Sequence, residues 1–182
     1  FIDHTTTSYY ATYINADFVS KFSNTDVRNL FVASSTITNP ADFRRYTTRK
    51  FKFNFGSDVP LIRTAEMILI DAEALARTPG KEAEAHDLLY ALQKNRDVNA
   101  VKSTNTGAAL IDEILLERRK ELYAENGVEW FDAKRLRKGI TRTGNHRIFK
   151  NLSADDKRFF LKVPQSEIDA NESIDDTVNK DR

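Results

Sequence analysis

The chain has 182 residues, of which 40% are hydrophobic and 30% charged, a composition typical of a folded globular domain rather than a disordered segment. Its formal net charge of +1 excludes a global electrostatic field that would recruit nucleic acid or an anionic membrane surface. The absence of cysteine excludes disulfides, thiolate metal ligands and a cysteine nucleophile within these residues.

The first third of the chain carries mixed signals. We expect a helix from about residue 8 to residue 22, followed by a less regular stretch from 25 to 46. Residues 50–55 alternate Lys or Asn with Phe, a period of two that predicts a strand. The aromatic positions of the expected helix are Tyr9, Tyr13, Phe18 and Phe22.

Three stronger helices are predicted in the middle of the chain, over about residues 60–77, 81–95 and 107–125. Pro60 suits the first turn of the first helix, and Asn126-Gly127 is a typical stop for the third. Because the connection between the first two helices is short, they should pack as an antiparallel hairpin. The buried stripe predicted for the first helix is Leu61, Ala65, Ile68, Ala72 and Leu75.

The last third is richer in loops. A short amphipathic segment is expected over residues 129–138, and residues 153–156 resemble a cap that opens a helical turn. An extended apolar run follows at 159–164, and the tail from 172 onwards is polar. The expected fold class is therefore mainly α, with helical hairpins, long loops and a few short strands.

Several charged residues fall on faces that should be buried. Arg118 lies on the apolar stripe of the third helix, and Glu66 and Glu73 share a face of the first. Since a buried charge without a partner is costly, we predict an internal Arg–Glu network that fixes helix register. Its predicted members are Arg63, Glu66, Glu73, Arg96, Glu117, Arg118, Glu121, Glu125, Trp130, Asp132 and Arg135.

The competing interpretation of these carboxylates is a glycosidase pair, either Glu66 with Glu73 or Glu117 with Glu121. A general acid needs a raised pKa, whereas a neighbouring arginine lowers it, so the structural network is the favoured hypothesis. No metal or cofactor is expected, because the three histidines are isolated. Tyr9, Tyr13 and Tyr46 are candidates for stacking on sugar rings.

Four ordered segments contain recognisable motifs, and they lie at residues 63–75, 92–96, 117–132 and 163–171. Together they resemble the SusD/RagB family of outer-membrane nutrient-binding lipoproteins. Residues 63–75 (RTAEMILIDAEAL) resemble the family's R-x-A-E helix, and 92–96 (LQKNR) its following L-N-x-V-R segment. Residues 117–132 (ERRKELYAENGVEWFD) resemble the E-R-x-x-E-L signature, with Asn126 as an extra residue and Glu129 in place of the usual Arg. Residues 163–171 (VPQSEIDAN) resemble the closing I-P-x-x-E-x-x-x-N stretch.

The resemblance implies a helical protein without enzymatic activity, which captures oligosaccharides or other nutrients at the cell surface for a TonB-dependent outer-membrane transporter. It implies membrane attachment only through a lipid anchor outside these residues, and no nucleic-acid partner. Residues 60–182 correspond to the family's C-terminal helical region, and 1–59 are expected to be a lead-in that continues a longer protein. The alternative hypothesis is a helical protein–protein interaction module that binds no glycan.

Overall fold

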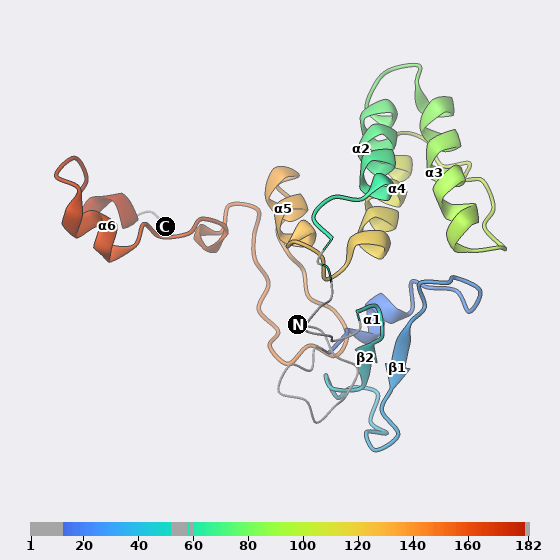
Figure 1. The fold of residues 1–182 in the computed structure, drawn as a ribbon, viewed down its shortest axis with the longest axis horizontal. Coiled ribbons are helices and arrows are strands. Elements are labelled where there is room, and N and C mark those ends of the chain that lie inside the picture. Colours follow the sequence, from blue (N-terminus) through green and yellow to red (C-terminus); the bar gives the residue numbers. More distant parts are fainter. Residues whose placement is uncertain (1–12, 52–57, 59, 181–182) are drawn as a thin grey trace. The chain divides into compact units, whose positions relative to one another are not determined.

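The computed structural model describes residues 13–51, 58 and 60–180, and it is mainly helical, as the sequence predicts (Figure 1). Within this described part, no helix combines the length and the hydropathy that a membrane-spanning segment requires. The helices are α1 (Ala16–Val19), α2 (Thr64–Ala76), α3 (Glu82–Arg96), α4 (Gly107–Leu122), α5 (Val128–Arg135) and α6 (Gln165–Ala170), with 3-10 turns η1 (Lys157–Phe159) and η2 (Asp176–Asn179). The strands are β1 (Phe31–Ala33) and β2 (Tyr46–Thr48).

Three long helices dominate the first of two compact units, which comprises the described residues up to Glu129 together with Thr143–Arg147. Helix α2 packs against both α3 and α4, and α2 and α3 form the antiparallel hairpin expected from their short connection (Figure 1). Small side chains at the contacts let the helix axes approach closely. The buried core of the three helices consists of Ala65, Leu69, Ala72, Ala76, Ala85, Leu89, Leu92, Leu110 and Ile114.

A second, aromatic core lies beside the small sheet of the same unit. Phe18 and Phe22 make edge-to-face contacts with one another at a centroid distance of 5.2 Å, and Phe18 meets the ring of Tyr123 at 5.3 Å. Phe31 of β1 packs on Phe22 at 4.9 Å. Because Tyr123 directly follows α4, this core joins the end of α4 to the N-terminal segment.

The N-terminal elements differ from the sequence-based expectation. Of the helix predicted over residues 8–22, the described part is helical only at Ala16–Val19, and residues 1–12 lie outside the described residues. Asn15 caps this short helix by accepting a hydrogen bond from the backbone of Asp17 at 2.8 Å. The strand predicted over 50–55 falls mostly outside the described residues. β1 lies within the stretch 25–46 that was expected to be less regular, and β2 begins at the last residue of that stretch.

Helix α2 begins later than Pro60 suggests. The Asn126 side chain donates hydrogen bonds to the carbonyls of Pro60 and Leu61 at 3.0 and 2.9 Å, and the N-cap Arg63 is extended. The prediction that Pro60 opens the helix is therefore wrong, and so is the burial predicted for Leu61, whose residue is 76% exposed. Local propensity was overridden by a tertiary contact from the segment after α4.

Helix α4 ends at Leu122, three residues before the predicted end. The chain then turns through positive φ at Ala124, Asn126 and Gly127, a conformation that glycine adopts readily and alanine does not. The residue after the helix, Tyr123, is extended, and its ring enters the aromatic core. Helix α4 therefore ends early because Tyr123 is buried in the aromatic core. The Asn126-Gly127 stop signal in the sequence gives no information about that burial.

The second unit comprises the described residues from Trp130 to Arg142 and from Ile148 onwards. Trp130 packs on Phe159 at a centroid distance of 4.7 Å, and Ile140 pairs with Leu152 in an isolated antiparallel bridge. Asp156 caps the 3-10 turn η1, close to the cap expected at 153–156. The predicted polar tail is partly ordered, because the Asn179 side chain exchanges hydrogen bonds with the backbone of Val163.

Candidate functional site

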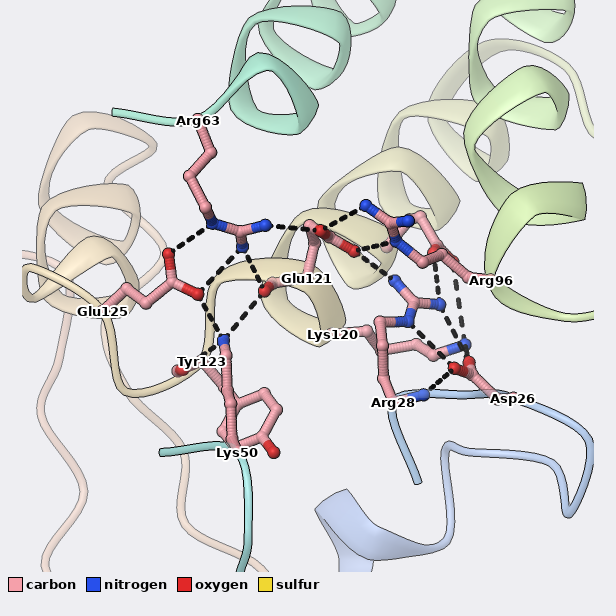
Figure 2. A network of polar contacts seen from close by, with 10 residues as sticks. Asp26, Arg28, Lys50, Arg63, Arg96, Lys120, Glu121, Tyr123 and Glu125 are labelled. Carbon is pink, nitrogen blue, oxygen red and sulfur yellow. Dashed lines mark hydrogen bonds and ion pairs between the residues drawn. The ribbon is translucent and has the colours of Figure 1, made fainter. Parts of the chain in front are cut away.

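The ends of three helices meet at a group of charged side chains in the first unit (Figure 2). Arg63 is the N-cap of α2, Arg96 is the last residue of α3, and Glu121 lies in the last turn of α4. Cations placed at the C-terminal ends of α3 and α4 interact favourably with the helix dipoles. We call this group the charged cluster; its members are Asp26, Arg28, Lys50, Arg63, Arg96, Glu117, Lys120, Glu121 and Glu125.

Glu121 is the centre of the charged cluster, with a side chain only 3% exposed. Arg28, Arg63 and Arg96 each donate to its carboxylate, at distances between 2.8 and 3.0 Å. Burial raises the pKa of Glu121, but the hydrogen bonds from Arg96 and Arg63 outweigh it and hold this pKa at about 2. The group is therefore a fixed negative charge near neutral pH.

Arg28 also contacts two further acids of the cluster, Asp26 and Glu117. The Arg28 guanidinium donates to Asp26 at 2.8 and 2.9 Å and contacts Glu117 at 2.7 Å. The Lys120 ammonium lies 3.0 Å from Asp26 and 3.7 Å from Glu117. Burial raises the pKa of Asp26, yet hydrogen bonds from Arg28 and Lys120 bring it down to about 2. Arg28 thus ties the loop before β1 to α4.

The C-terminal end of α4 is capped by side chains from other segments. Lys50 donates to the backbone carbonyls of Glu121 and Tyr123 at 2.9 and 2.8 Å and contacts Glu125 at 2.5 Å. Arg63 donates to the same Glu121 carbonyl and to both carboxylate oxygens of Glu125. These bonds satisfy carbonyls that the helix itself leaves unpaired. Burial lowers the pKa of Lys50, which nevertheless keeps three oxygen partners.

An open pocket of about 220 Å³ adjoins the charged cluster. Its walls combine partly exposed cations with apolar side chains and the buried carboxylate of Glu121. The lining residues are Val27, Arg28, Leu30, Lys50, Arg63, Arg96, Lys120, Glu121 and Tyr123.

Comparison with known proteins assigns the fold. The sequence profile described as the SusD family matches residues 6–179. The chain belongs to the SusD family. No curated protein matches this SusD-family chain.

A solved structure agrees with this family membership at the level of the fold. It is a SusD-like carbohydrate binding protein from Bacteroides vulgatus, with a TM-score of 0.77 and 22% sequence identity. The match covers 92% of this SusD-family chain and 42% of the Bacteroides vulgatus chain. The chain therefore spans less than half of the length of that protein.

Five members of the predicted Arg–Glu network come together in the charged cluster: Arg63, Arg96, Glu117, Glu121 and Glu125. They derive from three separate motif segments, at residues 63–75, 92–96 and 117–132. These five charged positions of the SusD-family motifs thus lie at the start of α2 and near the ends of α3 and α4.

Other predicted network residues lie elsewhere in this SusD-family chain. Arg118 donates to Glu66 at 2.9 Å, between α4 and α2. Glu73 accepts from Arg77 one turn later on α2, at 2.8 and 2.9 Å. The remaining three belong wholly to the second unit: Trp130, which packs on Phe159, and Asp132 and Arg135, which contact each other at 2.7 Å.

Four charged members of the cluster were absent from the sequence-based set: Asp26, Arg28, Lys50 and Lys120. Lys120 lies inside the family signature, at a helical position one turn after Glu117, so its spacing was an available signal. Asp26, Arg28 and Lys50 lie in loops, where no hydrophobic period marks a side chain as buried. We find no sequence signal that would have identified those three.

The carboxylates do not suit glycoside hydrolysis. A general acid must hold a proton near neutral pH, whereas the pKa of Glu121 is about 2. Glu66 and Glu73 are each paired with an arginine. Within the described residues, no group of three or more His, Asp or Glu side chains is placed to hold a metal ion.

Two of the tyrosines that were considered as stacking surfaces for sugar, Tyr13 and Tyr46, have other side chains packed near their rings. Tyr46 packs against the aromatic core, and the Arg45 guanidinium lies 5.6 Å from its ring centre. Tyr13 meets Phe43 edge-on at 5.6 Å. Tyr9 lies outside the described residues. A sugar-stacking role for Tyr13 and Tyr46 stays a prediction.

The depressed pKa values of Glu121 and Asp26 predict loss of stability in acid. Both carboxyls have ordinary pKa values near 4 in the unfolded chain and about 2 when folded. Their stabilisation is complete above the unfolded pKa and is lost as the pH falls from about 4.5 to about 2. At about 1.36 kcal/mol per pKa unit, these shifts correspond to roughly 2 kcal/mol for Asp26 and roughly 3 kcal/mol for Glu121.

Urea denaturation at pH 7, 4.5, 3.5 and 2.5 measures this dependence. The free energy of unfolding should fall steadily below pH 4.5, and Glu121→Gln should flatten the dependence. An equal slope in the two proteins would contradict the assignment to Glu121.

Proposed function

We propose that this chain is part of a non-enzymatic cell-surface protein that captures oligosaccharides for uptake through a TonB-dependent outer-membrane transporter. The observation that carries the proposal is the SusD-family match over residues 6–179. The similar fold of a carbohydrate binding protein from Bacteroides vulgatus supports it. In this proposal the charged cluster is a rigid frame that holds loops against α2, α3 and α4.

Membrane attachment belongs to the same proposal. We infer a lipid anchor outside the 182 residues, because SusD-family proteins are generally associated with the outer membrane at the cell surface. Labelling of intact cells with a membrane-impermeant reagent tests this location. Labelling only after cell lysis would contradict it.

The experiment that tests capture is a glycan array probed with the purified full-length protein that contains this chain. We expect saturable binding to a subset of glycans and no release of reducing ends from any of them. Release of reducing ends that Glu121→Gln abolishes would show an enzyme instead. Co-purification of a TonB-dependent transporter with the tagged protein would support the partner.

One observation favours the alternative, a protein-interaction module. Helix α2 exposes apolar side chains on the face away from its neighbours, with Met67 and Ile70 45% and 47% exposed. A face of this kind suits a protein partner. If the glycan array gave no binding and the pull-down recovered no transporter, this alternative would be the better explanation.

A further inference from the structure

The pocket beside the charged cluster has a wall that is mostly cationic. Five cations line it, Arg28, Lys50, Arg63, Arg96 and Lys120, and Glu121 is the one acid among the lining residues. Clefts lined by one sign of charge concentrate counter-ions. The wall therefore presents a positive surface to solvent.

The carboxylates of the charged cluster do not fully neutralise the five cations that line the pocket. Asp26, Glu117 and Glu125 complete the cluster but do not line the pocket, so five cations face four carboxylates and leave a formal excess of +1. The ends of α3 and α4 add about −0.5 each and the start of α2 adds about +0.5, which offsets only half of the excess.

The pocket offers two kinds of contact. The Arg63 and Arg96 side chains are each 29% exposed, so part of each arginine reaches solvent while its guanidinium also pairs with Glu121. Val27 and Leu30 add apolar surface and are 65% and 40% exposed. Guanidinium groups match the planar geometry of carboxylate and the oxygen spacing of sulfate.

We propose that this pocket binds the carboxylate or sulfate of an acidic sugar, so that the captured glycan carries uronate or sulfate groups. This inference rests on the proposed glycan capture and names its substrate class. The volume of about 220 Å³ is below the range of drug-sized pockets, which limits the occupant to about one sugar residue. The apolar face of the sugar ring packs against Val27 and Leu30, and the anionic group lies against Arg63 and Arg96.

An added negative charge at the pocket rim tests the proposal without replacing any member of the charged cluster. Val27→Glu adds a negative charge at an exposed lining residue, and Val101→Glu is the matched control, because Val101 is 83% exposed and does not line the pocket. Binding is followed by isothermal titration calorimetry and by the amide signals of residues 27–30. The probes are glucuronic acid, glucose 6-sulfate, glucose and sodium acetate, with the purified full-length protein.

We expect glucuronic acid or glucose 6-sulfate to bind saturably and to shift these amide signals, while glucose does not. Val27→Glu should weaken this binding at least about fivefold, and Val101→Glu should leave it within about twofold. Stronger binding of the uronate than of the sulfate ester would identify the carboxylate as the anion. The reverse order would identify the sulfate.

Equal binding of glucose and glucuronic acid would overturn the inference, as would an unchanged affinity in Val27→Glu. Acetate that binds as tightly as glucuronic acid would also overturn it, since the sugar would then contribute nothing. A glycan array with neutral glycans bound and acidic glycans ignored would overturn the acidic-sugar inference and leave glycan capture intact. An array without any bound glycan would overturn glycan capture itself.

Discussion

Replacing Glu121 with glutamine is expected to lower the free energy of unfolding by about 3–5 kcal/mol. The glutamine keeps the volume of the side chain but removes the charge that Arg28, Arg63 and Arg96 share. Only one oxygen remains to accept, and the new amide points hydrogens at guanidinium groups. Three partly buried cations are then left without their central counter-charge.

Chemical denaturation in urea at pH 7, followed by far-ultraviolet circular dichroism, measures the effect of Glu121→Gln. Glu84→Gln is the matched control, because Glu84 is 54% exposed and its ion pair with Lys81 lies at the surface of α3. Exposed pairs of this kind contribute about 1 kcal/mol or less. A loss below about 1 kcal/mol for Glu121→Gln would mean that the cluster contributes little to stability.

Replacing Arg118 with methionine is expected to lower the free energy of unfolding by about 2–4 kcal/mol. The Arg118 side chain is 8% exposed and donates to Glu66 at 2.9 Å, which joins α4 to the first turn of α2. Methionine fills much of the space but leaves the Glu66 carboxylate, 19% exposed, without this cation. The N-terminal dipole of α2 still supports that carboxylate, so the expected loss is smaller than for Glu121→Gln.

Two comparisons distinguish the ion pair from simple packing. Arg119→Met changes the adjacent residue, which is 44% exposed and pairs with Glu129 at 2.7 Å, and should cost less than about 1 kcal/mol. The double variant Arg118→Met with Glu66→Met should recover part of the loss, because the Glu66 carboxylate is then removed together with its cation. Equal losses for Arg118→Met and Arg119→Met would show that burial of Arg118 has no energetic consequence.

The two substitutions probe different ion pairs of the first unit. Arg118 and Glu66 hold α4 against α2, whereas Glu121 connects the helix ends to loops through Arg28 and Arg63. A variant at Glu121 should therefore also loosen the pocket, and Arg118→Met should leave its lining in place. Glycan affinity measured on both variants under conditions where they remain folded would separate these roles.

The long helices were the most predictable elements. Apolar side chains at steps of three and four placed α2, α3 and α4 within a few residues, because a helix that buries one face must repeat at that period. Their ends were less accurate. The start of α2 depends on hydrogen bonds from Asn126, and the end of α4 depends on burial of Tyr123. Both contacts join residues that are far apart in the sequence or outside any periodic pattern.

The charged cluster was only partly foreseeable. Arg63, Arg96 and Glu121 lie in motifs that resemble the SusD/RagB family. The cations Arg28 and Lys50 could not be recognised, because they lie in loops, where a buried charge and a solvated charge look alike in the sequence.

The sequence by itself determined the family, the mainly helical class and the three long helices, since motif spacing and hydrophobic period are local properties of the chain. Tertiary structure alone decided where α2 begins and which loop cations reach Glu121. It also decided that five cations line one pocket. Those outcomes depend on which distant segments meet, and a buried ion pair between such segments repays its desolvation cost only where the fold brings both partners together in good geometry.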